Sequence, residues 1–305
     1  MADTKTLKSK LQSVENIRKI TKAMELVARS KMKKTIDRVL NIRPYAYFAI
    51  EFLVNFSEHP SSSIHSYFTT TTAKKTLIIY IASNKGLCGG YNSNILRDMR
   101  IYLNQIDSQA RELIEYVAVG KYAVQHVSNL HGTPLASFTH FSENVSFHEI
   151  QNLSDRIKKE WETGEYKKVV IGFTNFKSTL SQKPIFRQLL PFSIDILKNQ
   201  ILNSKEENWI DFSNMESNRN WDQYIIEPSH EAITDLIIPQ LINVQIYHAI
   251  LDAYASEQAS RMIAMKNASE NADTLGGELL LSINHLRQEG ITKELSEIAA
   301  GSEGF

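Results

Sequence analysis

The sequence predicts an α/β protein whose two ends form a long antiparallel coiled coil, with a Rossmann-like α/β domain inserted between them. Two observations lead to this fold class. Residues 4–56 and 230–299 each carry apolar residues at steps of three and four, which is the period of a helix with one buried face. Between them, over residues 77–190, short apolar runs alternate with helical segments, as expected for a sheet with parallel strands.

The N-terminal segment, residues 4–56, is expected to be one helix of about 75 Å, at 1.5 Å per residue. A helix of that length has to pack against something equally long. Pro44 should bend it, because proline removes one helical hydrogen bond. The expected apolar stripe includes Leu7, Leu11, Val14, Ile17, Ile20, Met24 and Val27.

The middle of the chain is expected to form the α/β domain. A Ser/Thr-rich connector, residues 57–76, precedes predicted strands at 77–83, 116–120 and 169–173. Residues 179–182 and 185–190 should complete the sheet. Helices are expected after the second strand, over 148–163, and from a cap at Asn92–Asn94 to about residue 105. The polar stretch 196–222 is interpreted as an insert or linker.

The C-terminal segment is expected to be a second long helix, capped by Ser229 and kinked near Pro239. Gly276 and Gly277 should weaken it locally. Residues 255–272 are rich in small side chains, so another helix could approach closely. The expected apolar stripe of this C-terminal helix includes Met262, Met265, Leu275, Leu279 and Leu286. A compact insert between the two helices favours an antiparallel pair.

Charge is distributed unevenly, although the net charge of the whole chain is zero. Residues 1–43 have a net charge of about +8 and residues 252–305 of about −5. A basic N-terminus alone would suggest nucleic acid, but an acidic C-terminus favours mutual pairing or a protein partner. Aromatic residues are also scarce among the N-terminal lysines, which argues against stacking on single strands. We therefore expect no nucleic-acid partner.

The glycine loop that follows the first predicted strand, Gly86–Gly90, fits neither phosphate-binding pattern, G-x-x-x-x-G-K-[ST] or G-x-G-x-x-G. A tight strand-to-helix turn is the favoured interpretation. Cys88 is the only cysteine, and the nine histidines lack the spacing of metal ligands. With no membrane-span-length apolar run and no secretory pattern, a cytoplasmic-facing protein without metal, cofactor or catalytic site is expected.

Five segments, spread in order over the whole chain, resemble the gamma subunit of F-type ATP synthases of the bacterial type. Residues 8–32 contain Ile20-Thr21-Lys22-Ala23-Met24, a familiar form of the family's N-terminal helix. Residues 255–272 and 287–298 are similar to its two C-terminal signatures. The other matches are Arg43-Pro44-Tyr45 and the loop formed by Gly86, Leu87, Cys88, Gly89, Gly90 and Asn92.

The resemblance implies a non-catalytic rotor shaft that couples transmembrane proton flow to ATP synthesis. One copy would stand inside a hexameric ring of alpha and beta subunits, with a foot on the epsilon subunit and the membrane rotor ring of c subunits. Lys22 and Met24 would lie against moving beta-subunit domains, and Arg261 would meet a loop of a catalytic subunit. The contact near the shaft tip would be made by Arg287, Gln288, Thr292 and Glu294. The loop Gly86–Asn92 would belong to the foot.

The resemblance also implies a peripheral location on the cytoplasmic face of the bacterial inner membrane. Expected segments are the helix 1–58, the foot domain 75–195, the polar insert 196–227 and the helix 228–305. Asn84-Lys85 departs from the family's usual Asp-Arg, and Glu289-Gly290 replaces two small residues. With Cys88 alone, the chain cannot form the regulatory cysteine pair of chloroplast members. Three alternatives remain: a gamma-like shaft in a specialised motor, a coiled-coil adaptor, and a nucleotide-binding enzyme using residues 83–92.

Overall fold

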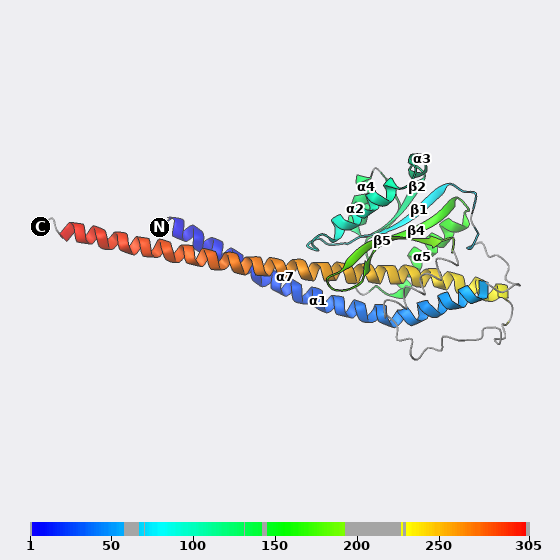
Figure 1. Cartoon of the computed structure of the whole chain (residues 1–305), viewed down its shortest axis with the longest axis horizontal. Coiled ribbons are helices and arrows are strands. Elements are labelled where there is room, and N and C mark those ends of the chain that lie inside the picture. Colours follow the sequence, from blue (N-terminus) through cyan, green and yellow to red (C-terminus); the bar gives the residue numbers. More distant parts are fainter. Residues whose placement is uncertain are drawn as a thin grey trace. The chain divides into compact units, whose positions relative to one another are not determined.

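The computed structural model describes residues 2–57, 67–69, 71–130, 132–141, 145–192, 227 and 230–302. The chain forms two compact units. One consists of Met1–Ser30 with Arg261–Phe305, and the other of Lys31–Ser260. Two long helices, α1 (Ala2–Ser57) and α7 (His230–Ser302), each contribute to both units (Figure 1). The predicted insert 196–222 lies outside the described residues.

The larger unit, Lys31–Ser260, is built on a five-stranded sheet in the order β3-β2-β1-β4-β5. The strands are β1 (Lys75–Ile81), β2 (Ile114–Val119), β3 (Pro134–Phe138), β4 (Tyr166–Phe176) and β5 (Gln182–Leu190). The first four are parallel, and β5 pairs antiparallel with β4. The α/β class is therefore confirmed, with a mixed sheet whose parallel part is its core.

Helices cover both faces of this sheet, because alternate residues of β1 point to opposite sides. Leu77, Ile79 and Ile81 pack with α5 (Phe147–Glu162) and the first part of α7. Ile78 and Tyr80 pack with α2 (Tyr91–Asn104) and α4 (Lys121–Asn129). A short helix, α3 (Ser108–Arg111), leads into β2. All of these strand residues are buried, which explains the continuous apolar run in the sequence.

In the larger unit, α7 is the central helix of the core. Ile238, Leu241, Ile242, Ile246 and Ile250 are fully buried beside the sheet. Side-chain hydrogen bonds supplement this packing: Ser256 donates to the carbonyl oxygen of Thr174, and Ser154 donates to the side-chain oxygen of Asn243. By length and composition, Asp235–Ser296 could also cross a membrane, but most of its apolar window is buried inside the protein, as in the core helix of a soluble fold.

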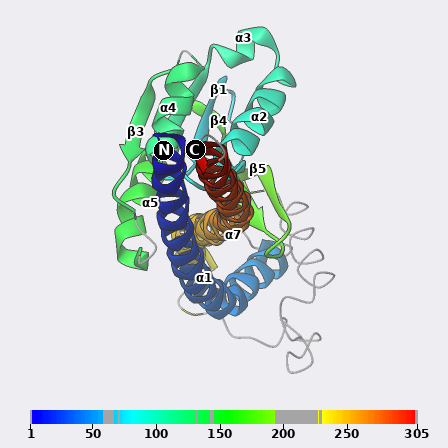
Figure 2. The same ribbon diagram turned by 90° about the vertical axis from the view of Figure 1, so that its left-hand side faces the viewer.

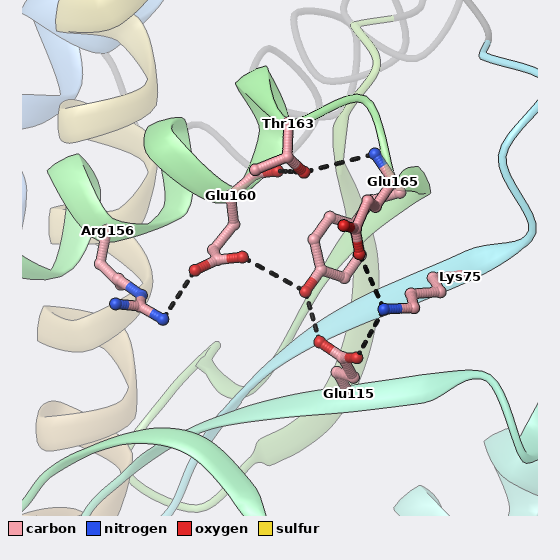
Figure 3. Close-up of polar contacts among 7 residues, drawn as sticks. Lys75, Glu115, Arg156, Glu160, Thr163 and Glu165 are labelled. Atoms are coloured by element: carbon pink, nitrogen blue, oxygen red, sulfur yellow. Dashed lines mark hydrogen bonds and ion pairs between the residues drawn. The ribbon is translucent and has the colours of Figure 1, made fainter.

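Charged residues fasten the edge of the sheet at which β1, β2 and β4 begin. Lys75 lies between two carboxylates, 3.1 Å from Glu115 and 2.8 Å from Glu165 (Figure 3). The phenol of Tyr166 donates to Glu115, and Arg156 forms a 2.7 Å ion pair with Glu160. The hydrogen bond from Tyr166, assisted by Lys75, holds the pKa of Glu115 below its usual value. This network fixes the start of the parallel strands.

The smaller unit is a pair of antiparallel helices. Arg18 of α1 forms a 3.4 Å ion pair with Asp273 of α7, and Leu11 and Val14 lie beside Gly276. Residue numbers thus rise on one helix as they fall on the other, and the predicted antiparallel pairing is confirmed. Both views show the start of α1 beside the end of α7 (Figures 1 and 2), and α7 continues past the start of α1.

Several predicted details of the elements were wrong. Asn92–Asn94 do not cap α2: the helix begins at Tyr91 after Gly90, and Asn92 is buried within its first turn. Strand β3 was missed, and the two predicted segments give one strand, β5 (Gln182–Leu190), with Pro184 inside it, while residues 179–181 lie in the turn before it. As an edge strand, β5 has one side without a ladder partner, which is where proline is tolerated. Pro44 lies within α1, whose second half changes direction in Figure 1.

Candidate functional site

The helix pair buries a stripe of α1 that matches the predicted one only in part. Leu7, Leu11, Val14 and Met24 are turned inward as predicted. The other inward positions are 21, 25 and 28, which include buried Glu25 and Ala28, and the roughly seven-residue repeat is interrupted at exposed Arg18. Ile17, Ile20 and Val27 were expected on this stripe but are each more than half exposed. The same shift occurs on α7, where Ala272 is buried and Leu275 is 46% exposed. Small residues therefore share the seam with Leu11 and Val14, and several other large apolar residues lie outside it.

A buried carboxylate on α1, which sequence reasoning missed, organises the cations around it. Glu25 is 1% exposed and accepts hydrogen bonds from Lys22 at 2.9 Å and Arg29 at 2.8 Å. Lys22 itself is exposed and Met24 is half-buried, so both predicted contact residues remain accessible on the helix. The spacing of Lys22, Glu25 and Arg29, at i, i+3 and i+7, was the available signal.

A groove of about 500 Å³ lies between the two helices of this unit. Its α1 wall carries cations and its α7 wall carries acids, with an apolar floor from Ala23 and Leu26. Glu270 and Asp273 form the acidic side, and Asp273 pairs with Arg18. The remaining lining residues are Lys19, Lys22 and Ser269. Predicted contact residue Lys22 thus belongs to a grooved surface with charges of both signs.

Arg261 does not face outward as predicted: its side chain is only 8% exposed. The predicted tip residues Arg287, Gln288, Thr292 and Glu294 are all exposed, and Thr292 donates to the carbonyl oxygen of Gln288. They belong to the last part of α7, a helix that ends at Ser302 and continues past the start of α1 in Figure 1.

The glycine loop lies at the end of β1, where its interior is filled by its own side chains. Asn92 accepts from the Ser83 backbone N–H at 3.2 Å and donates to the Ser83 hydroxyl at 2.7 Å. It also donates to Sγ of Cys88, which is buried. Leu87 and Gly89 have φ values of 60° and 57°, and Leu87 is 64% exposed. The loop is a tight turn that presents Leu87 outward.

Asn84 ties this loop to two other parts of the larger unit. Its side-chain nitrogen donates to the carbonyl oxygen of Phe141 at 2.8 Å, and its oxygen accepts from the Lys121 backbone at 3.0 Å. Tyr254 of α7 donates to the same Phe141 oxygen. A carboxylate could only accept in this position, whereas the amide both donates and accepts, so the departure from Asp at this position has a local structural role.

Over the described ranges, no group of three or more His, Cys, Asp and Glu side chains is placed to hold a metal ion. The buried polar side chains of the glycine loop bond to one another, as Ser83 and Asn92 do. What the structure presents instead is two exposed surfaces, one on the helix pair and one at the glycine loop.

Comparison with known proteins decides the family. A family model described as ATP synthase matches residues 3–305. The ATP synthase gamma chain of Polynucleobacter necessarius is 36% identical over 310 residues, and that of Paraburkholderia xenovorans is 35% identical over 306. Each alignment covers 99% of both chains. The chain belongs to the ATP synthase gamma chain family.

Solved structures agree with this family. A central-stalk chain of the Tetrahymena thermophila mitochondrial ATP synthase is 28% identical, with a TM-score of 0.58, covering 82% of this chain and 99% of that one. A chain of the Euglena gracilis enzyme, at 17% identity and a TM-score of 0.62, shows the same fold. This gamma chain is thus a central-stalk rotor subunit of an F-type ATP synthase, and catalysis belongs to other subunits.

Proposed function

We propose that the paired helices of this gamma chain act as an asymmetric shaft inside a ring of alpha and beta subunits. The observation that carries the proposal is the set of large apolar side chains that the helix pair leaves in solvent. Such patches are usually covered by a partner. On α1 they are Ile17, Ile20, Leu26 and Val27, and on α7 Leu275, Leu280, Leu281, Ile291, Leu295 and Ile298.

Different residues would contact the ring at different heights of the shaft. Lys22 and Met24, beside the groove, would lie against moving beta-subunit domains. Exposed Arg287, Gln288, Thr292 and Glu294 would form the contact near the tip. Arg261 is buried within the chain. We therefore propose that it stabilises the helix from inside the protein, and that neighbouring residues contact the catalytic subunit.

The shaft works without a catalytic group of its own. Its two helices differ in charge and in exposed apolar residues, so each face offers a catalytic site a different surface. Rotation driven by proton flow would present these faces to the three sites in turn. Each site then shifts between conformations according to its contacts with the shaft. Stiffness and reversible polar contacts are the requirements.

The larger unit would serve as the foot of the rotor. The subunit acts in a membrane-associated ATP synthase complex with other subunits. We propose that one copy per complex binds the epsilon subunit and the ring of c subunits, on the cytoplasmic face of the bacterial inner membrane. The loop Gly86–Asn92, with exposed Leu87, would belong to the foot contacts. Our proposed segments remain 1–58, 75–195, 196–227 and 228–305.

A reconstitution tests the proposal. The full chain is assembled with purified alpha, beta, epsilon and membrane subunits, and ATP-driven rotation of a bead on the foot is recorded together with ATP synthesis under a proton gradient. We expect rotation in three equal steps, and synthesis that is lost when the chain is omitted. Full synthesis without the chain, or a complex that excludes it, would overturn the proposal.

A further inference from the structure

The hairpin between β4 and β5 ends in a rigid turn. The hairpin tip, residues 177–183, is closed by a bond from the backbone N–H of Ser178 to the Ser181 oxygen at 3.0 Å, and by one from Ser181 to Ser178 at 3.2 Å. The side-chain nitrogen of Gln182 donates to the carbonyl oxygens of Thr179 at 2.6 Å and Ser178 at 3.0 Å. One glutamine thus holds two turn carbonyls.

The same glutamine fastens the tip to α7. Its side-chain oxygen accepts from the hydroxyl of Ser260 at 3.2 Å, and one turn earlier Ser256 donates to the Thr174 carbonyl oxygen at 3.0 Å. Figure 1 shows this hairpin crossing α7. The hairpin is therefore joined to α7 through side-chain hydrogen bonds at two successive turns, one of them at the tip, and little order has to be gained when the tip binds a partner.

What the rigid tip presents is one leucine among positive charges. Leu180 is 86% exposed, the highest value among the exposed large apolar residues of the described part of the chain. Lys177 and Lys183 on either side are exposed, and the sequence has no Asp or Glu between Glu165 and Asp195. Strand and turn together form an acid-free surface with a single apolar knob.

We propose that the hairpin tip docks into another subunit of the synthase, onto an acidic surface with an apolar recess that receives Leu180. Opposite charges would orient the two surfaces, since charge complementarity favours the correct partner and register. Leu180 would supply the buried contact at the centre, and the lysines the rim. This proposal rests on the proposed rotor function, because the partner is taken to be a subunit of the same complex.

The first experiment locates the partner. Benzoyl-phenylalanine is placed at position 180 of the full chain, or at Leu135 of β3, which is 39% exposed, as the control. Each chain is assembled into the complex, and ATP hydrolysis and rotation are verified before illumination. We expect position 180 to cross-link to one subunit, through a peptide rich in Asp and Glu, at least tenfold more than position 135. An active complex without this cross-link, or with a link to a basic peptide, would overturn the proposal.

The second experiment tests the charges. Binding of the cross-linked subunit is measured for Lys183→Glu, Lys183→Arg and Lys167→Glu, the last being an exposed lysine near the other end of the hairpin. We expect Lys183→Glu to weaken binding about tenfold, because the new negative charge would be repelled by the acidic surface of the partner. Binding of Lys183→Arg and Lys167→Glu should stay within about twofold of the unmodified chain. Equal effects of Lys183→Glu and Lys167→Glu would refute charge recognition at the tip. A chain that enters no complex at all would overturn the proposed function, and this docking site with it.

Discussion

Gly120 passes so close to Ala82 that a Cβ atom on it would lie 2.1 Å from the Ala82 carbonyl oxygen. Gly120 also has a φ of 99°, outside the usual range of residues with a side chain. Two strand ends therefore meet here through backbone alone, beside the glycine loop. The backbone N–H of Tyr122 donates to the Ser83 oxygen at 3.0 Å in the same place.

Gly120→Ala is expected to lower the free energy of unfolding by about 3 kcal/mol or more, because strain and a backbone clash combine. Gly164→Ala is the matched control: its φ is 74°, but nothing lies within 4 Å of the added Cβ. That control should cost about 1 kcal/mol from the backbone conformation alone. Urea unfolding of the isolated chains measures both, and equal losses would show that the contact with Ala82 is not limiting.

Asn84→Asp is expected to destabilise the larger unit by about 1–2 kcal/mol, since a carboxylate cannot donate to the Phe141 carbonyl oxygen. The bond from the Lys121 backbone would survive. Asn94→Asp makes the same chemical change at an exposed site in the first turn of α2, where negative charge is tolerated. Unfolding curves of the two variants should differ accordingly. A neutral Asn84→Asp would mean that the donor to Phe141 is dispensable.

Half-buried Arg187 and buried Asp252 should be energetically coupled. Asp252 is 1% exposed, lies 3.6 Å from His248, and interacts electrostatically with Arg187. Asp252→Ala is expected to cost about 1–3 kcal/mol, because half-buried Arg187, whose Nε is buried, loses the nearby opposite charge. Adding Arg187→Met should recover part of that loss, which a double-mutant cycle measures. At the exposed Arg18–Asp273 pair, Asp273→Ala should cost less than about 1 kcal/mol; similar costs at both sites would contradict the argument.

His126 should make stability depend on pH. Its Nδ1 lies 2.9 Å from the Tyr80 hydroxyl, and burial, with Arg100 nearby, lowers the pKa of its ring. Since the folded pKa lies below the unfolded value of about 6.5, the unfolded state takes up a proton first, and stability falls as pH drops below about 6.5. In His126→Asn, which keeps an acceptor, this loss should be smaller. The free energies of unfolding of the unmodified chain and of His126→Asn are compared at pH 7.5 and 5.5. The same pH dependence in both proteins would refute the assignment to His126.

Gln288→Ala and Arg261→Ala are expected to distinguish a residue that contacts a partner subunit from one that stabilises the fold. Gln288 is exposed, so its replacement should lower ATP synthesis in the assembled complex while the melting temperature stays unchanged. Arg261 is 8% exposed, so its replacement should lower the unfolding free energy by about 1–3 kcal/mol. Calorimetry and synthesis assays on both variants test this. A destabilising Gln288→Ala or a stable, uncoupled Arg261→Ala would reverse the two assignments.

Local patterns were sufficient for the elements of the fold. The continuous apolar run at 77–83 predicted β1, and the repeat of apolar residues at three and four positions predicted both long helices. Strand β3 escaped because Pro134–Phe138 lies at the sheet edge, where only alternate residues are half-buried and no apolar run is needed. Asn92 was predicted to cap α2 because polar residues are common at helix starts. In the structure its side chain lies in the first turn of the helix and accepts a hydrogen bond from the backbone N–H of Ser83.

The sequence by itself determined the family, the α/β class and the antiparallel helices, because periodicity and motif are local properties. Only the tertiary structure decided which face of each helix is buried. Hydrophobicity assigned Ile17, Ile20 and Val27 to the seam, but the close approach of two slender helices admits Ala28 and Gly276 there and surrounds Glu25 with cations. Leu11 and Val14 stay in this seam beside Gly276, while Ile17, Ile20 and Val27 are left outside it, and it is this exposed surface that a ring of partners can use.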